Sequence, residues 1–257
     1  VLPHTPYSAK LAHAGHRAGK EIILHAPMSN SGGMPLGPGG LTPTLSEAAF
    51  ARTLEDDIDA IPHVRGINNH MGSELTTMPQ QMAWVMETLL RRELYFVDSR
   101  TSPRTIAGKT ADQFAVPYLS RSVFLDNEAT KDAIGRQFRA LVRRAEHKGL
   151  AVGIGHPYAA TADYLKTALP GLRCRGIRLA LVSEVLQESG DLPDTAAPPL
   201  DDYSPASEPD FNTVLGHISL GLGNRVLPEV EDTGSENGIG STQGNTFYQM
   251  IQVTHSP

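Results

Sequence analysis

The sequence predicts an α/β protein in which parallel strands alternate with helices over residues 1–190. Three observations support this prediction: short apolar runs recur, amphipathic helical segments separate them, and polar residues of a few types follow the runs. A strand–helix unit of roughly thirty residues is typical of parallel pairing, because a parallel connection needs a crossover of a dozen residues or more. Six such strands are compatible with an open sheet or with a barrel.

The candidate strands are short, apolar and bounded by polar or glycine-containing segments. They lie at residues 21–24, 64–68, 95–97, 123–125, 150–154 and 177–182.

The candidate helices between them show apolar residues at helical spacing. One stripe consists of Met82, Val85, Met86, Leu89 and Leu90, and a second consists of Ile134, Phe138, Leu141, Val142 and Ala145, ending at Gly149. A third helix carries Phe50, Leu54 and Ile58, after Thr44 and Glu47 at capping-box spacing and before Pro62. Residues 10–19 form a further helix, whereas residues 28–40 and 100–113 are predicted to be irregular loops.

The composition changes at about residue 190. Residues 191–257 contain ten acidic residues and one basic residue, Arg225, and residues 191–209 are rich in Pro, Asp and Ser. We therefore expect a domain over 1–190 and an acidic Pro/Gly/Ser-rich linker and tail over 191–257. The tail should be weakly ordered with few contacts to the domain, apart from possible short strands at 211–222 and 246–253.

Several functional classes are disfavoured by composition. The net charge of −6 argues against a nucleic-acid partner. Cys174 is the single cysteine, which rules out an internal disulfide and a zinc site built from several cysteines. The sequence contains no apolar run long enough to span a membrane, and no signal peptide is visible after Val1.

Polar residues that can bind a metal follow most of the strands. They are His25, His70, Asp98, Asp126 and His156. The carboxyl ends of parallel strands lie on one face, so these side chains should converge there. Imidazole and carboxylate groups bind zinc and related ions, a carboxylate can accept a proton from the metal-bound water, and a histidine can protonate a leaving group. The sequence contains neither a phosphate-binding glycine loop nor a G-x-S-x-G motif.

Five segments in order resemble the divergent polysaccharide deacetylase family. They are His25-Ala-Pro-Met28, Asn68-Asn69-His70-Met71-Gly72-Ser73, Asp98-Ser99-Arg100-Thr101, Val123-Phe124-Leu125-Asp126-Asn127 and Gly155-His156-Pro157. The resemblance covers roughly residues 2–188. It implies a distorted (β/α) barrel, a divalent metal with zinc as the first expectation, and hydrolysis of acetyl groups on a glycan or another acetylated small molecule. It also implies a periplasmic or otherwise exported protein.

The resemblance suggests a role for each candidate, and each role has a structural alternative. The expected metal ligands are His25, which could instead cap the long loop, and His70. The expected catalytic residues are Asp98, as base or orienting carboxylate, and His156, as general acid; alternatively, Asp98 pairs with Arg100 or Arg121 and His156 is a turn residue. The expected substrate-binding residues are Asn69, Ser73, Arg100 and Asp126. Asn69 and Ser73 could be turn residues, and Asp126 could be a helix N-cap. Five further histidines are expected at the surface or at loop ends: His4, His13, His16, His63 and His147.

One feature departs from the family pattern. Relatives begin with a strand that ends in an Asp-Asp pair, whereas residues 2–8 resemble the segment after the second strand. We therefore expect an N-terminally truncated barrel that binds metal weakly. The alternatives are a non-catalytic carbohydrate- or envelope-binding protein on a decayed deacetylase scaffold, and a structural fragment without activity of its own.

Overall fold

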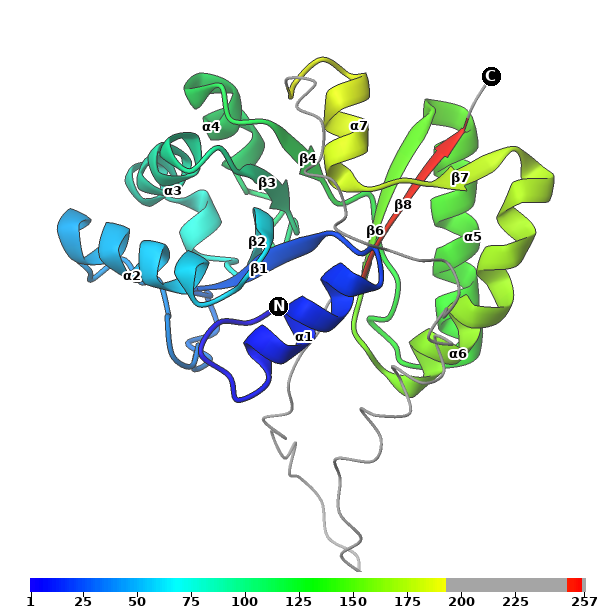
Figure 1. The fold of residues 1–257 in the computed structure, drawn as a ribbon, viewed down its shortest axis with the longest axis horizontal. Helices are drawn as coiled ribbons and strands as arrows, with labels where there is room; N and C mark the ends of the chain where they lie inside the picture. Colours follow the sequence, from blue (N-terminus) through cyan, green and yellow to red (C-terminus); the bar gives the residue numbers. More distant parts are fainter. Residues whose placement is uncertain (193–248, 256–257) are drawn as a thin grey trace, which may run out of the picture. The chain divides into compact units, whose positions relative to one another are not determined.

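The computed structural model describes residues 1–192 and 249–255, which form two four-stranded sheets (Figure 1). The first sheet has the order β1-β2-β3-β4, with every pair parallel. Its strands are β1 (Ile22–Met28), β2 (Val64–Met71), β3 (Tyr95–Asp98) and β4 (Tyr118–Ser120). The second sheet has the order β5-β6-β8-β7. Its strands are β5 (Val123–Phe124), β6 (Leu150–Gly155), β7 (Ile177–Leu179) and β8 (Gln249–His255). The predicted α/β class with parallel pairing is confirmed.

Helices connect the strands, and Figure 1 shows α2, α3 and α4 on one side of the first sheet. The α-helices are α1 (Ser8–Arg17), α2 (Glu47–Asp59), α3 (Pro79–Arg91), α4 (Ala107–Phe114), α5 (Lys131–Lys148), α6 (Ala159–Ala168) and α7 (Val182–Glu188). Two 3₁₀ helices, η1 (Leu75–Thr77) and η2 (Leu169–Arg175), complete the described elements. Helix α5 ends at Gly149 in a left-handed conformation, as predicted. Helix α2 is capped by Ser46, whose side chain accepts from the Ala49 amide, so the predicted Thr44–Glu47 capping box is wrong.

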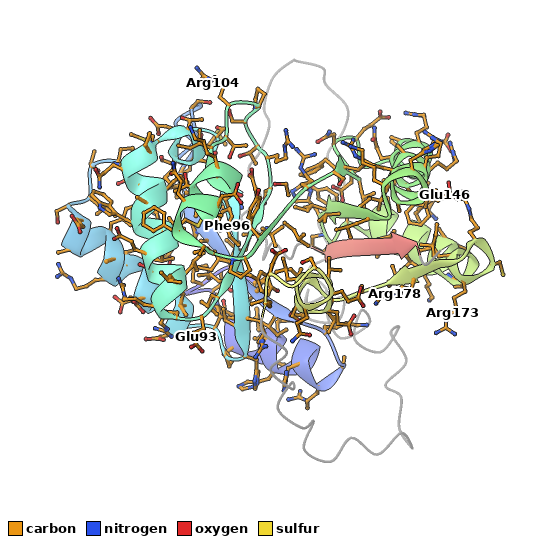
Figure 2. All side chains as sticks on the ribbon, turned by 90° about the horizontal axis from the view of Figure 1, so that it is seen from above. Glu93, Phe96, Arg104, Glu146, Arg173 and Arg178 are labelled. Atoms are coloured by element: carbon orange, nitrogen blue, oxygen red, sulfur yellow. The ribbon has the colours of Figure 1, made fainter. Side chains whose placement is uncertain are left out.

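Alternation along β1 separates the core-facing residues from His25. Leu24, Ala26 and Met28 of β1 belong to a fully buried apolar cluster with residues of α2 and α3. Phe96 of β3 belongs to the same cluster, and Figure 2 shows it between strand and helices. Because successive side chains of a strand point to opposite faces, His25 lies on the face opposite to this cluster.

Several predicted boundaries are wrong. Strands β1 and β2 extend past the predicted ends at residues 24 and 68, through His25 and His70, to Met28 and Met71. Residues 107–113 of the predicted loop belong to α4, whose buried residues include Ala107, Thr110 and Ala111, too small to give a clear apolar stripe. The predicted strand 177–182 ends at Leu179, and α7 begins at Val182. Strand β4 was not predicted.

The C-terminal strand contradicts the expectation that the tail makes few contacts. Strand β8 is antiparallel to β6 from Leu150↔Thr254 to Gly155↔Gln249, and it is also paired with β7. The described residues, 1–192 and 249–255, accordingly belong to one compact unit. The predicted strand at 246–253 is therefore close to β8, whereas the predicted strand at 211–222 and most of the predicted linker lie outside the described residues.

The strands of residues 1–192 and 249–255 pair as two sheets, not as one closed ring. The structure therefore shows an α/β fold with two sheets, and the barrel expected from the family resemblance stays a prediction. No helix in the described part of the chain has the length and apolarity needed to cross a membrane.

Candidate functional site

Two histidines on neighbouring strands form the centre of the candidate site. His25 Nε2 lies 3.0 Å from His70 Nδ1, and the two rings meet edge to face at 4.8 Å between centroids. His25 Nδ1 lies 3.0 Å from Asn68 Oδ1, and Asn68 Nδ2 donates to Ser99 Oγ at 3.1 Å. The parallel register of β1 with β2, which opposes His25 to Asn68, brings these side chains together. His25 is therefore held within its strand, and the alternative that it caps the following loop is wrong.

The hydrogen bond to Asn68 determines which nitrogen of His25 faces His70. An amide oxygen can only accept, so His25 Nδ1 carries the proton and Nε2 carries the lone pair. Burial lowers the pKa of His25 well below its ordinary value, the charge of His70 lowers it further, and the Asn68 bond partly opposes both. Burial and the charge of His156 lower the pKa of His70 to about 4. Both rings are therefore neutral at neutral pH, which is the state that binds a metal.

A second pair, Asp126 and His156, lies at the ends of the strands of the second sheet. Asp126 is 3% exposed and accepts three hydrogen bonds. They come from the His156 backbone amide at 2.6 Å, His156 Nδ1 at 3.0 Å and the Thr161 hydroxyl at 2.7 Å. The N-cap of the following helix is Thr130, so the alternative role of Asp126 as that N-cap is wrong. Asp126 instead orients His156.

His156 connects the two pairs electrostatically. A charge on His156 lowers the pKa of both His25 and His70, so the three histidines converge as predicted. The ring of His156 stacks on Tyr158 at 5.0 Å and lies 5.4 Å from the ring of Phe124. His156, which the alternative interpretation treats as a turn residue, is therefore a packed and hydrogen-bonded ring.

Asp98 is buried at the end of β3, where both carboxylate oxygens bind the loop that follows. Oδ1 accepts from the Arg100 amide at 2.8 Å, and Oδ2 accepts from the Thr105 hydroxyl at 3.1 Å. Burial raises the pKa of Asp98, and these two hydrogen bonds oppose the shift. Arg121 donates to the carbonyls of Ser99 and Arg100 at 2.5 and 2.8 Å instead of pairing with Asp98. The geometry thus fits a positioning carboxylate, and the ion pair with either arginine is wrong.

Two of the residues expected to bind substrate, Asn69 and Ser73, connect loops at the first sheet. Asn69 Oδ1 accepts from the Ser99 amide at 2.8 Å, and its Nδ2 donates to the Met71 carbonyl at 2.7 Å. Ser73 Oγ accepts from the Ser31 amide at 3.1 Å, which ties the turn after β2 to the loop after β1. Asn69 is therefore a strand residue that braces a loop. Its neighbour Asn68 and the helix residue Thr161 were missed, although Asn68 stands in the same motif.

Four of the other histidines lie away from this centre. His13 and His63 are exposed, as predicted, and His63 stacks on His16 at 3.9 Å between centroids. His4 is also exposed, as predicted, and its Nε2 contacts the fully buried Asp57 at 2.8 Å. Burial raises the pKa of Asp57 to about 8, with a further contribution from the charge of Asp56.

The histidine pair fits one side of a metal site. Two nitrogens at zinc-binding distance in a tetrahedral site lie about 3.3 Å apart, which is close to the 3.0 Å between His25 Nε2 and His70 Nδ1. A catalytic zinc site uses three protein ligands. The residues whose placement is described contain no cluster of three or more His, Cys, Asp or Glu side chains that could hold a metal.

These features define an α/β protein with a histidine-rich site at the ends of parallel strands. Residues 1–186 match the family model described as divergent polysaccharide deacetylase, and the chain belongs to that family.

The relatives are similar over most of the described region. The chain is 35% identical over 199 residues to the Uncharacterized protein YibQ of Escherichia coli (strain K12), covering 77% of this chain and 61% of that protein. It is 33% identical over 172 residues to an Uncharacterized protein of Haemophilus influenzae (strain ATCC 51907 / DSM 11121 / KW20 / Rd), covering 67% of this chain and 61% of that protein. The chain thus spans about three-fifths of the length of these curated relatives.

A solved structure confirms the fold class. The crystal structure of the uncharacterized protein ATU2773 from Agrobacterium tumefaciens C58 matches with a TM-score of 0.69, covering 72% of this chain and 76% of that chain. At 24% sequence identity this likeness shows the fold alone.

Proposed function

We propose that the chain carries the histidine-bearing part of a divalent-metal-dependent hydrolase that removes acetyl groups from a glycan. The observation that supports this most directly is the pair of buried neutral imidazoles, His25 and His70, with two ring nitrogens 3.0 Å apart. The family described as divergent polysaccharide deacetylase supplies the reaction class.

In this proposal His25 and His70 hold the cation, with zinc as the first choice. A bound divalent cation polarises the acetyl carbonyl and lowers the pKa of a water molecule to about 7. Asn68 fixes the ring of His25 so that Nε2 faces the cation, as carbonyl and amide partners commonly do for metal-binding histidines. A third protein ligand has to come from outside the described residues, because those residues contain no cluster of three.

His156 would act as the general acid for the leaving group. Asp126 accepts the Nδ1 proton of His156 at 3.0 Å, so the opposite nitrogen is directed away from Asp126. A carboxylate in this position orients an imidazole. Tyr158 is 46% exposed beside this ring and would offer an apolar surface to a sugar. Asp98 would act indirectly, by holding Arg100 and its loop in place.

We also propose that the two sheets belong to one distorted barrel. A short segment between β4 and β5 connects them: the Arg121 amide donates to Asp98 of β3, and the Ser122 amide donates to Val152 of β6. These two bonds, 2.9 and 2.8 Å long, place adjacent residues on strands of different sheets.

Zinc titration of the 257-residue chain tests the metal part of the proposal. We expect weak binding of about one ion by calorimetry, and its loss in His70→Ala. The control is His147→Ala, which removes an exposed histidine of α5 and should leave binding unchanged. Acetate release from N-acetylglucosamine oligomers tests the reaction. Zinc binding that persists unchanged in His70→Ala would contradict the assignment of the ligands.

One observation favours a second candidate function, a non-catalytic carbohydrate-binding protein. It is the lack of a three-residue metal cluster within 1–192 and 249–255. Binding of acetylated oligosaccharides without zinc uptake or acetate release would favour this candidate. Zinc-dependent acetate release would exclude it.

A further inference from the structure

Arg121 lies in the segment between β4 and β5, and the residues at the end of β3 hold it in place. Its Nε donates to the Ser99 carbonyl at 2.5 Å, and a terminal nitrogen donates to the Arg100 carbonyl at 2.8 Å. Its backbone amide donates to the Asp98 carbonyl at 2.9 Å. A guanidinium group is planar, so two side-chain bonds of this kind fix both its position and the orientation of its plane.

Ion pairing does not explain why an arginine occupies this position. Burial lowers the pKa of Arg121, the charge of Arg100 lowers it further, and the charge of Asp98 opposes both. The side chain donates to two uncharged carbonyls instead of a carboxylate. Partial loss of hydration is unfavourable for a cation that has no such partner. The fork-shaped group therefore suits a geometric role better than an electrostatic one.

The same guanidinium contacts the second sheet through an aromatic ring. Arg121 Cζ lies 5.3 Å from the ring centroid of Phe124, the last residue of β5. The Phe124 ring in turn lies 5.4 Å from the His156 ring, at an angle of 56° between the planes. A cation over an aromatic face within about 6 Å is attracted to it. Arg121 therefore restrains a ring against which His156 packs.

The contact with Ser99 connects Arg121 to the histidine pair. Ser99 is 4% exposed, and its hydroxyl accepts from Asn68 Nδ2 at 3.1 Å. Asn68 Oδ1 accepts from His25 Nδ1 at 3.0 Å. Arg121 restrains Ser99 through its carbonyl, so it also restrains the amide that orients the ring of His25. One side chain is thus connected to His25 through two residues and to His156 through one.

We propose, building on the hydrolase function above, that Arg121 is a positioning residue that sets the placement of His156 relative to the histidine pair. In this role Arg121 acts through Ser99 and Phe124 and does not touch the substrate. The reaction requires His156 to reach the leaving group of an acetyl unit bound at the pair, and the two parts of the site lie in different sheets. A planar group bonded to one sheet and packed on the other fixes this separation more tightly than the connecting backbone alone.

NMR of the imidazole rings tests the placement in the whole chain without requiring activity. Arg121→Gln removes the charge and the fork, and Arg121→Lys keeps the charge but cannot bond to both carbonyls in one plane. We expect the ring signals of His25 and His156 to move in both variants, and the nuclear Overhauser effect between the Phe124 and His156 rings to weaken. The exposed His147 provides an internal reference whose signals should stay unchanged. The matched control is Arg104→Gln, which removes an exposed arginine at the periphery of the molecule (Figure 2).

Turnover provides a second measurement in any active form. Arg121→Lys should lower kcat roughly tenfold to hundredfold, because small displacements of a catalytic group cost this much. KM should stay close to the wild-type value, because Arg121 does not contact the substrate. A rise in KM at unchanged kcat would show that Arg121 binds substrate, and it would overturn the positioning role.

The outcomes separate this inference from the proposed reaction. Wild-type signals of His25 or of His156 in Arg121→Gln would overturn it, because the side chain would then support at most one part of the site. Wild-type signals of both rings in Arg121→Lys would also overturn it, as would unfolding of both variants, which would show a general structural role. Displaced signals of both rings, in a chain whose wild type releases no acetate, would support the positioning role and count against the hydrolase.

Discussion

Replacing Asp126 with asparagine tests whether this carboxylate sets the protonation of His156. The wild-type carboxylate accepts from the His156 amide, from His156 Nδ1 and from the Thr161 hydroxyl. The amide of Asp126→Asn offers one oxygen and one NH₂ group in the same space. If the oxygen keeps the His156 amide and Thr161, the NH₂ group faces His156 Nδ1 and forces that nitrogen to become an acceptor.

The size of the effect follows from these contacts. Asp126 is 3% exposed, so water cannot replace a lost partner. Loss of one hydrogen bond to a buried charged group should lower the free energy of unfolding by about 1.5–3 kcal/mol. The reversed tautomer of His156 should reduce turnover by a factor on the order of 10²–10⁴ in any active form, because Nε2 can then give up its proton only by leaving an imidazolate, whereas a general acid has to be an imidazolium.

Three measurements check this prediction. Nitrogen NMR of the imidazole should show the proton of His156 on Nδ1 in the wild type and on Nε2 in Asp126→Asn. Urea unfolding should show the loss of stability, and acetate release should show the loss of turnover. The control is Asp163→Asn, where an exposed carboxylate pairs with Lys131. A proton that stays on Nδ1, together with wild-type stability, would refute the argument.

Three further predictions concern the scaffold. Gly66→Ala should lower the free energy of unfolding by about 1–3 kcal/mol or more, because an added Cβ would lie 2.2 Å from the ring of Tyr95. Gly171→Ala, with nothing within 4 Å, is its control in urea unfolding, and equal effects would contradict the packing argument. For Asp57, a pKa raised to about 8 means that its stabilising contribution is complete below about pH 4 and is lost as the pH rises to 8. Thermal unfolding of Asp57→Asn should therefore depend less steeply on pH between 4 and 8, and an unchanged slope would be inconsistent with the shift. Removing residues 249–257 should lower the melting temperature and promote association, since β6 and β7 lose their shared partner strand; a monomer with wild-type melting would show that β8 is dispensable.

Much of the fold follows from local patterns, because helices such as α3 and α5 bury one stripe and the strands bury apolar runs. The strand ends were less predictable. Residues Asn68, Asn69 and His70 are polar, so the apolar pattern stops before them. They remain in β2 because the ladder with β1 continues to Met71 and because their side chains bond to His25 of β1 and to Ser99, which follows β3. These partners are distant in sequence, and no local pattern encodes them.

In the candidate site, too, some features follow from the sequence pattern and others depend on contacts between residues distant in sequence. Parallel topology alone predicted that histidines would gather at the strand ends. The contact of His25 with His70 and the orientation of His25 by Asn68 depend on the register between β1 and β2. Likewise, Asp126 stands where a helix N-cap is expected, and its actual partner lies thirty residues further along the chain.

The two histidine environments suit different tasks. His25 and His70 are neutral because burial lowers their pKa values, and an amide, which carries no charge, orients His25. Such rings keep lone pairs available over a wide pH range. This property suits the binding of a cation, but it makes the rings poor proton donors. His156 Nδ1 instead faces the buried carboxylate of Asp126, which holds the ring in one orientation and suits proton transfer at Nε2. Since the first sheet supplies the pair and the β5–β6 end of the second sheet supplies His156 with Asp126, neither sheet alone carries both functions. A hydrolase built in this way depends on the segment between β4 and β5 that connects the two sheets. In this segment Arg121 bonds to a strand of the first sheet and Ser122 bonds to a strand of the second.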